Sequence, residues 1–140
     1  MTSRSINDVS DTNVVIAVLK QRPAPLLERF TRELAQGTLA LSTIVLFELY
    51  YGIANSSRRK ENSDRLAVFL EAPIAMLSFE PEDAEEAGTL RAELRRAGTP
   101  IGPYDLLIAA QARRRGAVLV TANATEFARV PGLMMEDWLA

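Results

Sequence analysis

Short apolar runs and helical repeats alternate along this chain. Five short stretches are expected to be strands: 5–10, 38–43, 74–79, 117–122 and 132–139. The first is weak, because only Ile6 and Val9 in it favour extended structure. The runs at 74–79 and 117–122 are apolar over most of their length, which predicts strands buried on both faces.

The segments between these strands have the spacing of helices. Six helices are expected, at 12–20, 24–37, 43–55, 56–72, 81–98 and 102–116, with a helical turn at 124–130. Ser42 is a suitable N-cap for the third of them. The last two each carry a proline and acids in their first turn and end with arginines and a glycine, which complements the helix dipole.

Strands that alternate with helices indicate the α/β class with a parallel sheet. At 140 residues and 48% apolar composition, the chain is expected to form a single domain, residues 1–140. No segment reaches the roughly 20 apolar residues of a membrane span. The sequence MTSRSINDVSDTN at 1–13 lacks the apolar core of a signal peptide. We therefore expect a cytoplasmic protein with no membrane contact.

The composition excludes several kinds of chemistry. The chain has neither cysteine nor histidine, which excludes disulfides, thiolate metal sites, Ser–His and Cys–His nucleophiles and the usual zinc sites. The net charge of −2 does not favour nucleic-acid binding, although basic residues cluster at 58–60, 95–96 and 113–115. These clusters are either a local basic surface or solvated helix ends.

Four oxygen-bearing side chains stand where a plain structural role does not require them. Asp11 follows the first strand and Asn123 follows a buried strand, while Glu48 and Asp105 lie in apolar helices. Ligands bind at the carboxyl ends of parallel strands, so these positions indicate a shared site. Structural alternatives exist: Asp11 could cap the next helix and Asp105 could favour the helix dipole. Glu48 could face solvent, and Asn123 could belong to a turn.

Such a set of side chains suits a hard divalent cation. Mg²⁺ and Mn²⁺ prefer oxygen ligands, and clustered carboxylates repel one another unless a cation compensates them. A bound ion lowers the pKa of water and polarises a phosphoryl oxygen. This route to phosphodiester hydrolysis needs neither histidine nor cysteine.

At these residues the sequence resembles the PIN-domain nucleases, and more closely the VapC-type toxins of bacterial toxin–antitoxin pairs. The matching motifs are DTNVVIAVL (11–19), LSTIVLFELYYG (41–52), GTPIGPYDLLIAAQA (98–112) and VTANATEFARVPGL (120–133). The resemblance implies a PIN-like domain with a parallel five-stranded sheet flanked by helices on both faces. It also implies an endoribonuclease that uses Mg²⁺, for which Mn²⁺ substitutes. The implied partners are an RNA substrate, a second copy in a homodimer, and a cognate antitoxin with which a higher assembly can form.

The resemblance also assigns the site residue by residue. Asp11, Glu48 and Asp105 match the family's three main acids, which are the expected metal ligands and catalytic residues. Asn123 matches a fourth catalytic position that is often Asp and sometimes Asn. Supporting polar positions of the family match Thr12, Asn13, Thr121 and Glu126.

The sequence departs from the family's pattern in two places. The first strand reads SINDVS, whereas the family's first strand is usually a solid apolar run. Asn123 gives the site one negative charge fewer than an Asp there would. Asp8 is a competing acid near the first strand, but it lacks the Thr-Asn pair that follows Asp11, so Asp11 is preferred.

Two other classes of protein share some of these features. A receiver-type phospho-acceptor domain and a haloacid-dehalogenase-type phosphatase also use a strand-end Asp and Mg²⁺. Both want a lysine late in the fold, which this chain lacks, and the phosphatase wants a second Asp where Asn13 stands. A catalytically silent module that binds RNA or protein is the other alternative, suggested by Asn123. Phe47, Tyr50 and Tyr51 could form an antitoxin-docking surface or belong to the core.

Overall fold

A computed structural model of the chain describes residues 6–138. The strands are β1 (Asp8–Ser10), β2 (Leu39–Ser42), β3 (Ala75–Leu77), β4 (Val118–Thr121) and β5 (Met134–Asp137). The helices are α1 (Thr12–Leu19), α2 (Ala24–Ala35), α3 (Thr43–Ala54), α4 (Arg59–Phe69), α5 (Pro81–Arg96), α6 (Pro103–Arg115) and α7 (Ala124–Phe127). Each element expected from the sequence is therefore present, and only residues 5 and 139 of the expected strands lie outside the described chain.

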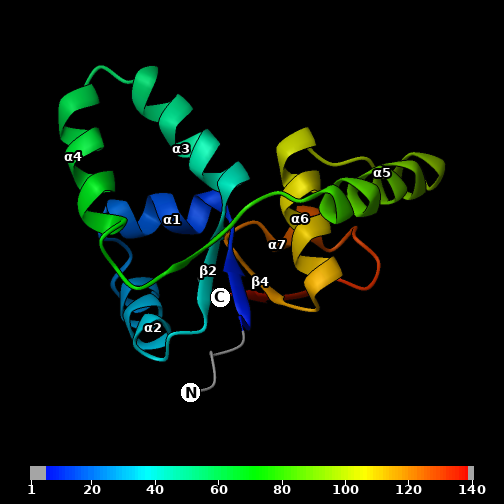
Figure 1. Ribbon diagram of the computed structural model, residues 1–140, viewed down its shortest axis with the longest axis horizontal. Coiled ribbons are helices and arrows are strands. Elements are labelled where there is room, and N and C mark those ends of the chain that lie inside the picture. Colours follow the sequence, from blue (N-terminus) through cyan, green and yellow to red (C-terminus); the bar gives the residue numbers. More distant parts are fainter. Residues whose placement is uncertain (1–5, 139–140) are drawn as a thin grey trace.

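The five strands form one parallel sheet in the order β3-β2-β1-β4-β5. Figure 1 shows α1, α2 and α4 on one side of the strands and α5, α6 and α7 on the other. The predicted α/β fold with helices on both faces is thus confirmed. That the whole of 1–140 is a single domain stays a prediction. In the described chain no helix combines the length and the apolar character that crossing a membrane would need.

Strand β3 differs from its prediction. The apolar run at 74–79 predicts a buried strand, but Ala75 and Met76 are exposed and only Leu77 of β3 is buried. The reason is position in the sheet, because β3 lies at its edge and pairs with β2 alone. An edge strand has no neighbour on one side, so an apolar run there need not be covered.

The centre of the sheet brings several strand ends to the same edge. In the register of β1, Ser10 is opposite Leu41 of β2 and Val120 of β4. The three strands therefore end within one residue of one another, and their buried side chains anchor that edge in the core. Helices α1 and α3 begin directly after β1 and β2, at this edge. The sheet thus delivers the residues after its strands to one place.

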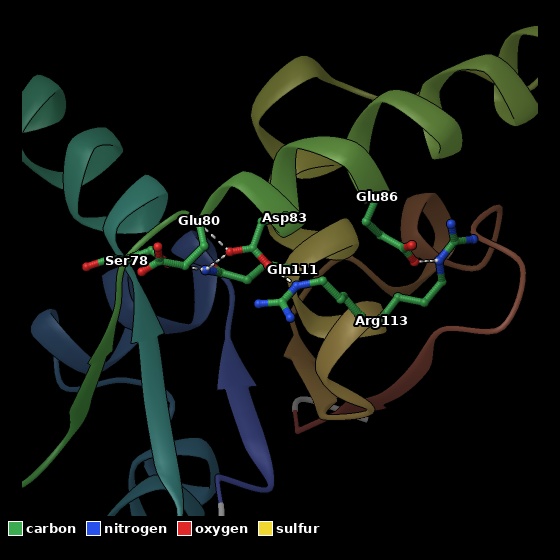
Figure 2. Close-up of polar contacts among 7 residues, drawn as sticks. Ser78, Glu80, Asp83, Glu86, Gln111 and Arg113 are labelled. Carbon is green, nitrogen blue, oxygen red and sulfur yellow. Dashed lines mark hydrogen bonds and ion pairs between the residues drawn. The ribbon is translucent and has the colours of Figure 1, made fainter.

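Helices α5 and α6 are joined by a buried polar network centred on Asp83, which has no exposed surface. Its carboxylate accepts a hydrogen bond from Gln111 Nε2 at 3.1 Å (Figure 2). It also accepts one from Arg114 Nε at 2.5 Å. The backbone N–H of Glu80 donates to it at 2.8 Å. Gln111 also donates to the carbonyl of Ser78 at 3.1 Å, so α6 is tied both to α5 and to the segment after β3.

The neighbouring Arg113 is also engaged in the fold. Its Nε donates to Glu86 of α5 at 2.6 Å, as Figure 2 shows, and its side chain is only 15% exposed. Another of its nitrogens donates to the carbonyl of Pro131 at 3.0 Å. Arg113 and Arg114 therefore hold helices together. For Arg113 both the open basic surface and the solvated helix end are therefore wrong, whereas Arg114 pairs with Asp83 and stays partly open to solvent.

Candidate metal centre

Asp11 is fixed at the carboxyl end of β1. Its backbone N–H donates to the carbonyl of Val120 at 2.9 Å. One carboxylate oxygen caps α1 by accepting from the N–H of Val14 at 2.9 Å, and the other accepts from the hydroxyl of Thr121 at 2.6 Å. Burial raises the pKa of Asp11, and these hydrogen bonds oppose the rise. Asp11 therefore does cap α1, as one of the structural alternatives expects. The same carboxylate also places a nearly buried acid at the carboxyl edge of the sheet.

Glu48 lies in the second turn of α3 and reaches back to the start of α1. The hydroxyl of Thr12 donates to its Oε1 at 2.6 Å. The side chain is half-buried, and its charge raises the pKa of both Asp11 and Asp105. Glu48 therefore faces the other acids, and the alternative that it simply faces solvent is wrong.

Asp105 occupies the first turn of α6, which begins at the same end of the sheet as α3 (Figure 1). Its pKa is raised to about 6, first by burial and then by the negative charges of Glu126, Glu48 and Asp11. Among the described residues no donor offers it a hydrogen bond and no cation pairs with it. Asp105 is thus the least compensated carboxylate of the group, which we call the acidic cluster (Asp11, Glu48, Asp105 and Glu126).

Asn123 and Glu126 connect the end of β4 to the start of α6. The backbone N–H of Asn123 donates to Thr121 Oγ1 at 2.7 Å, and its side-chain amide donates to Glu126 Oε2 at 2.9 Å. Glu126 Oε1 accepts from the N–H of Gly102 at 2.8 Å. A Cβ on Gly102 would lie 3.6 Å from both Asp105 Oδ2 and Glu126 Oε1, so these two carboxylates flank the same small volume.

Gly102 is the residue that the sequence analysis missed. It lies in the GTPIGPYDLLIAAQA motif (98–112), whose resemblance to the family assigns it no role. Its N–H orients Glu126, and its missing side chain leaves space between Glu126 and Asp105. The available signal was a glycine directly before Pro103, two positions ahead of a first-turn acid.

Asn13, an expected supporting residue, and Asp8, the competing acid, lie apart from the hydrogen bonds that hold the acids of the described chain. Asn13 is exposed on the first turn of α1 and takes no part in the hydrogen bonds that hold the acids. Asp8 begins β1, at the opposite end of the strand from Asp11. Its pKa is raised by burial and by the charges of Glu33 and Glu136. β1 thus places Asp8 and Asp11 at opposite ends, and the choice of Asp11 as a site residue stays a prediction.

The chemistry of the acidic cluster fits a hard divalent cation. The cluster offers carboxylate oxygens, it lies next to hydroxyl and amide groups, and no Lys or Arg of the described chain forms an ion pair with any of its members. The described chain contains no group of three acidic side chains close enough to be a ready-made metal site. Mg²⁺ keeps several of its waters in proteins, so ligation partly through water or after side-chain rotation would suit these positions.

The aromatic residues of α3 are surface residues. Phe47 is 48% exposed, Tyr50 is 52% exposed and Tyr51 is 64% exposed. The alternative that they belong to the core is therefore wrong, and this face of α3 is open to a ligand or a partner.

A family model, related sequences and related structures all indicate the same family for this chain. The PIN domain model matches residues 9–133. The chain is 42% identical over 128 residues to a tRNA(fMet)-specific endonuclease VapC of Shigella flexneri, which covers 91% of this chain and 95% of the relative. It is 40% identical over 129 residues to ribonuclease VapC2 of Haemophilus influenzae, covering 92% and 96%. The VapBC2 structure of Rickettsia felis, bound to a promoter DNA fragment, is 34% identical with a TM-score of 0.87, covering 94% of this chain and 98% of that one.

Proposed function

This chain belongs to the PIN domain family and is a VapC-type ribonuclease, the toxin of a toxin–antitoxin pair, and we propose that Asp11, Glu48 and Asp105 are its metal ligands. The observation that carries the assignment is the state of Asp105. Burial and three neighbouring acids disfavour its charge, and no donor among the described residues compensates it. A divalent cation would relieve this repulsion. Enzymes of this family depend on divalent metal ions, and we assign Mg²⁺ as the ion, with Mn²⁺ as its substitute.

The surrounding groups would prepare these ligands for phosphodiester hydrolysis. Held there, a divalent ion supplies a water of lowered pKa and polarises a phosphoryl oxygen. The hydroxyl of Thr121 fixes the orientation of Asp11, and that of Thr12 fixes Glu48. Asn123 would hold a water or a phosphate oxygen beside them. Attack of water in line with the leaving oxygen forms one P–O bond and breaks the opposite one, which cuts the RNA chain.

The substrate and partners follow from the same family. We propose an RNA substrate, with tRNA(fMet) as the first RNA to test, because it is named for a relative with 42% identity. An antitoxin protein is the partner, as in the VapBC complexes that share this fold. The homodimer stays a proposal, which the mass of the purified protein in solution would test.

Metal removal tests the proposed function directly. The purified chain should cleave tRNA(fMet), or another RNA from a total RNA pool, when Mg²⁺ or Mn²⁺ is added. Cleavage should stop on addition of EDTA and return when excess Mn²⁺ is restored, because in this proposal the bound ion lowers the pKa of the attacking water. Gel analysis of end-labelled RNA provides the measurement. Cleavage that continues unchanged in EDTA would contradict a metal-dependent site.

Thr121→Val is expected to slow cleavage by about 10- to 100-fold, the range found when a group that orients a metal ligand is removed. The substitution removes the hydrogen bond to Asp11 and the acceptor for the Asn123 N–H, with little change in volume. Cleavage rates at saturating Mn²⁺ measure the effect. Thr31→Val is the matched control, because its hydroxyl bonds only the carbonyl of Leu27 on the outside of α2. Equal rates for both variants would contradict the role given to Thr121.

The comparisons do not favour the alternative classes. A phospho-acceptor domain would need a lysine beside Asp11. Lys20 lies at the far end of α1 from Asp11, and Lys60 is exposed on α4, where it pairs with Asp64 at 3.4 Å. The relatives are named as ribonucleases, which also disfavours a catalytically silent module.

A further inference from the structure

The exposed aromatic side chains lie on α3 and α6, the two helices that carry Glu48 and Asp105. The chain has only three tyrosines and five phenylalanines. All three tyrosines and one phenylalanine have large exposed fractions: Phe47 48%, Tyr50 52%, Tyr51 64% and Tyr104 44%. The other aromatic side chains are buried or half-buried. Folding does not need these large side chains to be exposed. Exposed apolar surface that is grouped in this way is typical of a binding site.

Two of these rings contact each other between α3 and α6. The ring centroids of Phe47 and Tyr104 are 5.3 Å apart, with their planes inclined at 54°. Phe47 directly precedes Glu48 on α3, and Tyr104 directly precedes Asp105 on α6. We call Phe47 and Tyr104 the ring pair. It therefore spans the two helices that carry two of the proposed metal ligands, and about half of each side chain remains open to solvent.

Electrostatic repulsion opposes the binding of RNA beside the acidic cluster. The acidic cluster repels phosphates, the net charge of the chain is −2, and Arg113 and Arg114 are engaged in the fold. Stacking of a base on an aromatic ring does not depend on the charge of the protein, and every base has a flat face to offer. A nucleotide whose phosphate is bound at the divalent ion proposed for Glu48 and Asp105 would lie beside the ring pair, which is formed by the residues directly before these two acids.

We propose that the ring pair binds an unpaired base of the RNA substrate by stacking, directly next to the phosphate that is cleaved. This inference rests on the proposed nuclease function and adds a specificity-determining element to it. A base can stack there only after it has left its own helix, so the ring pair selects loops and single strands over intact duplex.

The test compares ring variants on intact and abasic RNA. The substrate is an oligoribonucleotide that spans a mapped cleavage site, made with every base or with a single abasic nucleotide on either side of the cut. Tyr104→Ala should lower kcat/KM on the intact RNA by about 10-fold or more. Tyr104→Phe keeps the ring and should cleave within about twofold of wild type. Val68→Ala is the control, an exposed apolar side chain on α4 outside the ring pair and the proposed site.

The abasic RNA separates stacking from a structural role. Wild type should lose on one abasic RNA about what Tyr104→Ala loses on the intact RNA, and the two proteins should cleave that abasic RNA equally. Equal cleavage of intact RNA by Tyr104→Ala and wild type would overturn the inference. So would an equal loss on intact and abasic RNA, or a loss of antitoxin binding with cleavage unchanged. If wild type cleaves no RNA, the nuclease proposal fails first and the stacking inference falls with it.

Discussion

Asp105→Asn is expected to abolish RNA cleavage while the protein stays folded. The substitution keeps the shape of the side chain but removes the charge of a proposed metal ligand. Loss of a group that only supports a ligand costs about 10- to 100-fold, so loss of the ligand itself should cost more than about 100-fold. Rates of cleavage of end-labelled RNA with Mn²⁺ in excess measure the effect.

The same variant should not be destabilised when metal is absent. Burial and three neighbouring acids raise the pKa of Asp105 to about 6, so its charge opposes folding at neutral pH. The neutral amide removes that opposition, and the melting temperature of Asp105→Asn in EDTA should equal or exceed that of wild type. Glu28→Gln, an exposed charge removed from α2, is the control for both measurements. Cleavage by Asp105→Asn at the wild-type rate would refute the assignment of the site.

The second large effect is on stability, at Asp83 between α5 and α6. Asp83→Asn should lower the free energy of unfolding by about 3 kcal/mol, the low end of the range for breaking a buried ion pair. The low end applies because the partner Arg114 is 30% exposed and water can partly solvate its charge. Urea unfolding followed by circular dichroism gives the value. Glu82→Gln removes an exposed acid from the same turn and should cost less than about 1 kcal/mol.

The stability that Asp83→Asn loses should depend on pH. Burial raises the pKa of this carboxyl, but the hydrogen bonds from Arg114, the Glu80 N–H and Gln111 outweigh burial and leave the pKa below its ordinary value. A carboxyl with a lowered folded-state pKa stabilises the protein above its unfolded pKa, near 4, and loses that contribution as pH falls through the folded-state pKa. The difference between wild type and Asp83→Asn should therefore be full at pH 7 and shrink below about pH 4. A difference that does not change with pH would contradict this origin.

Local signals predicted the elements well. Helices α5 and α6 begin with a proline and end near a glycine, and these signals act within one helix turn. The burial of Asp83 was out of reach, because its partner Arg114 lies 31 positions away on the next helix. The exposure of β3 was also out of reach, since an apolar run is the same in the middle of a sheet as at its edge. Only the order of the strands in the sheet decides whether such a run is a central strand or an edge strand.

The candidate site also has a part that the sequence predicts and a part that depends on the fold. The four main positions, Asp11, Glu48, Asp105 and Asn123, could be chosen from the sequence, because oxygen-bearing side chains in apolar surroundings or at strand ends are conspicuous. The hydroxyls that hold two of them, those of Thr12 and Thr121, are indicated by the family resemblance alone, and the sequence does not show which acid each one bonds. Thr121 bonds Asp11 across 110 positions, which only the β1–β4 pairing brings together. The contact of Phe47 with Tyr104 likewise depends on how α3 meets α6.

The most direct test of the central claim is the affinity for Mn²⁺, measured by calorimetric titration of the metal-free protein. Wild type and Glu28→Gln should bind Mn²⁺ alike. Asp11→Asn, Glu48→Gln and Asp105→Asn should each bind it more weakly by about 10-fold or more, because each removes one of the anionic groups proposed to share the ion. Wild-type affinity in any one of these three variants, or no binding by wild type, would contradict a shared site.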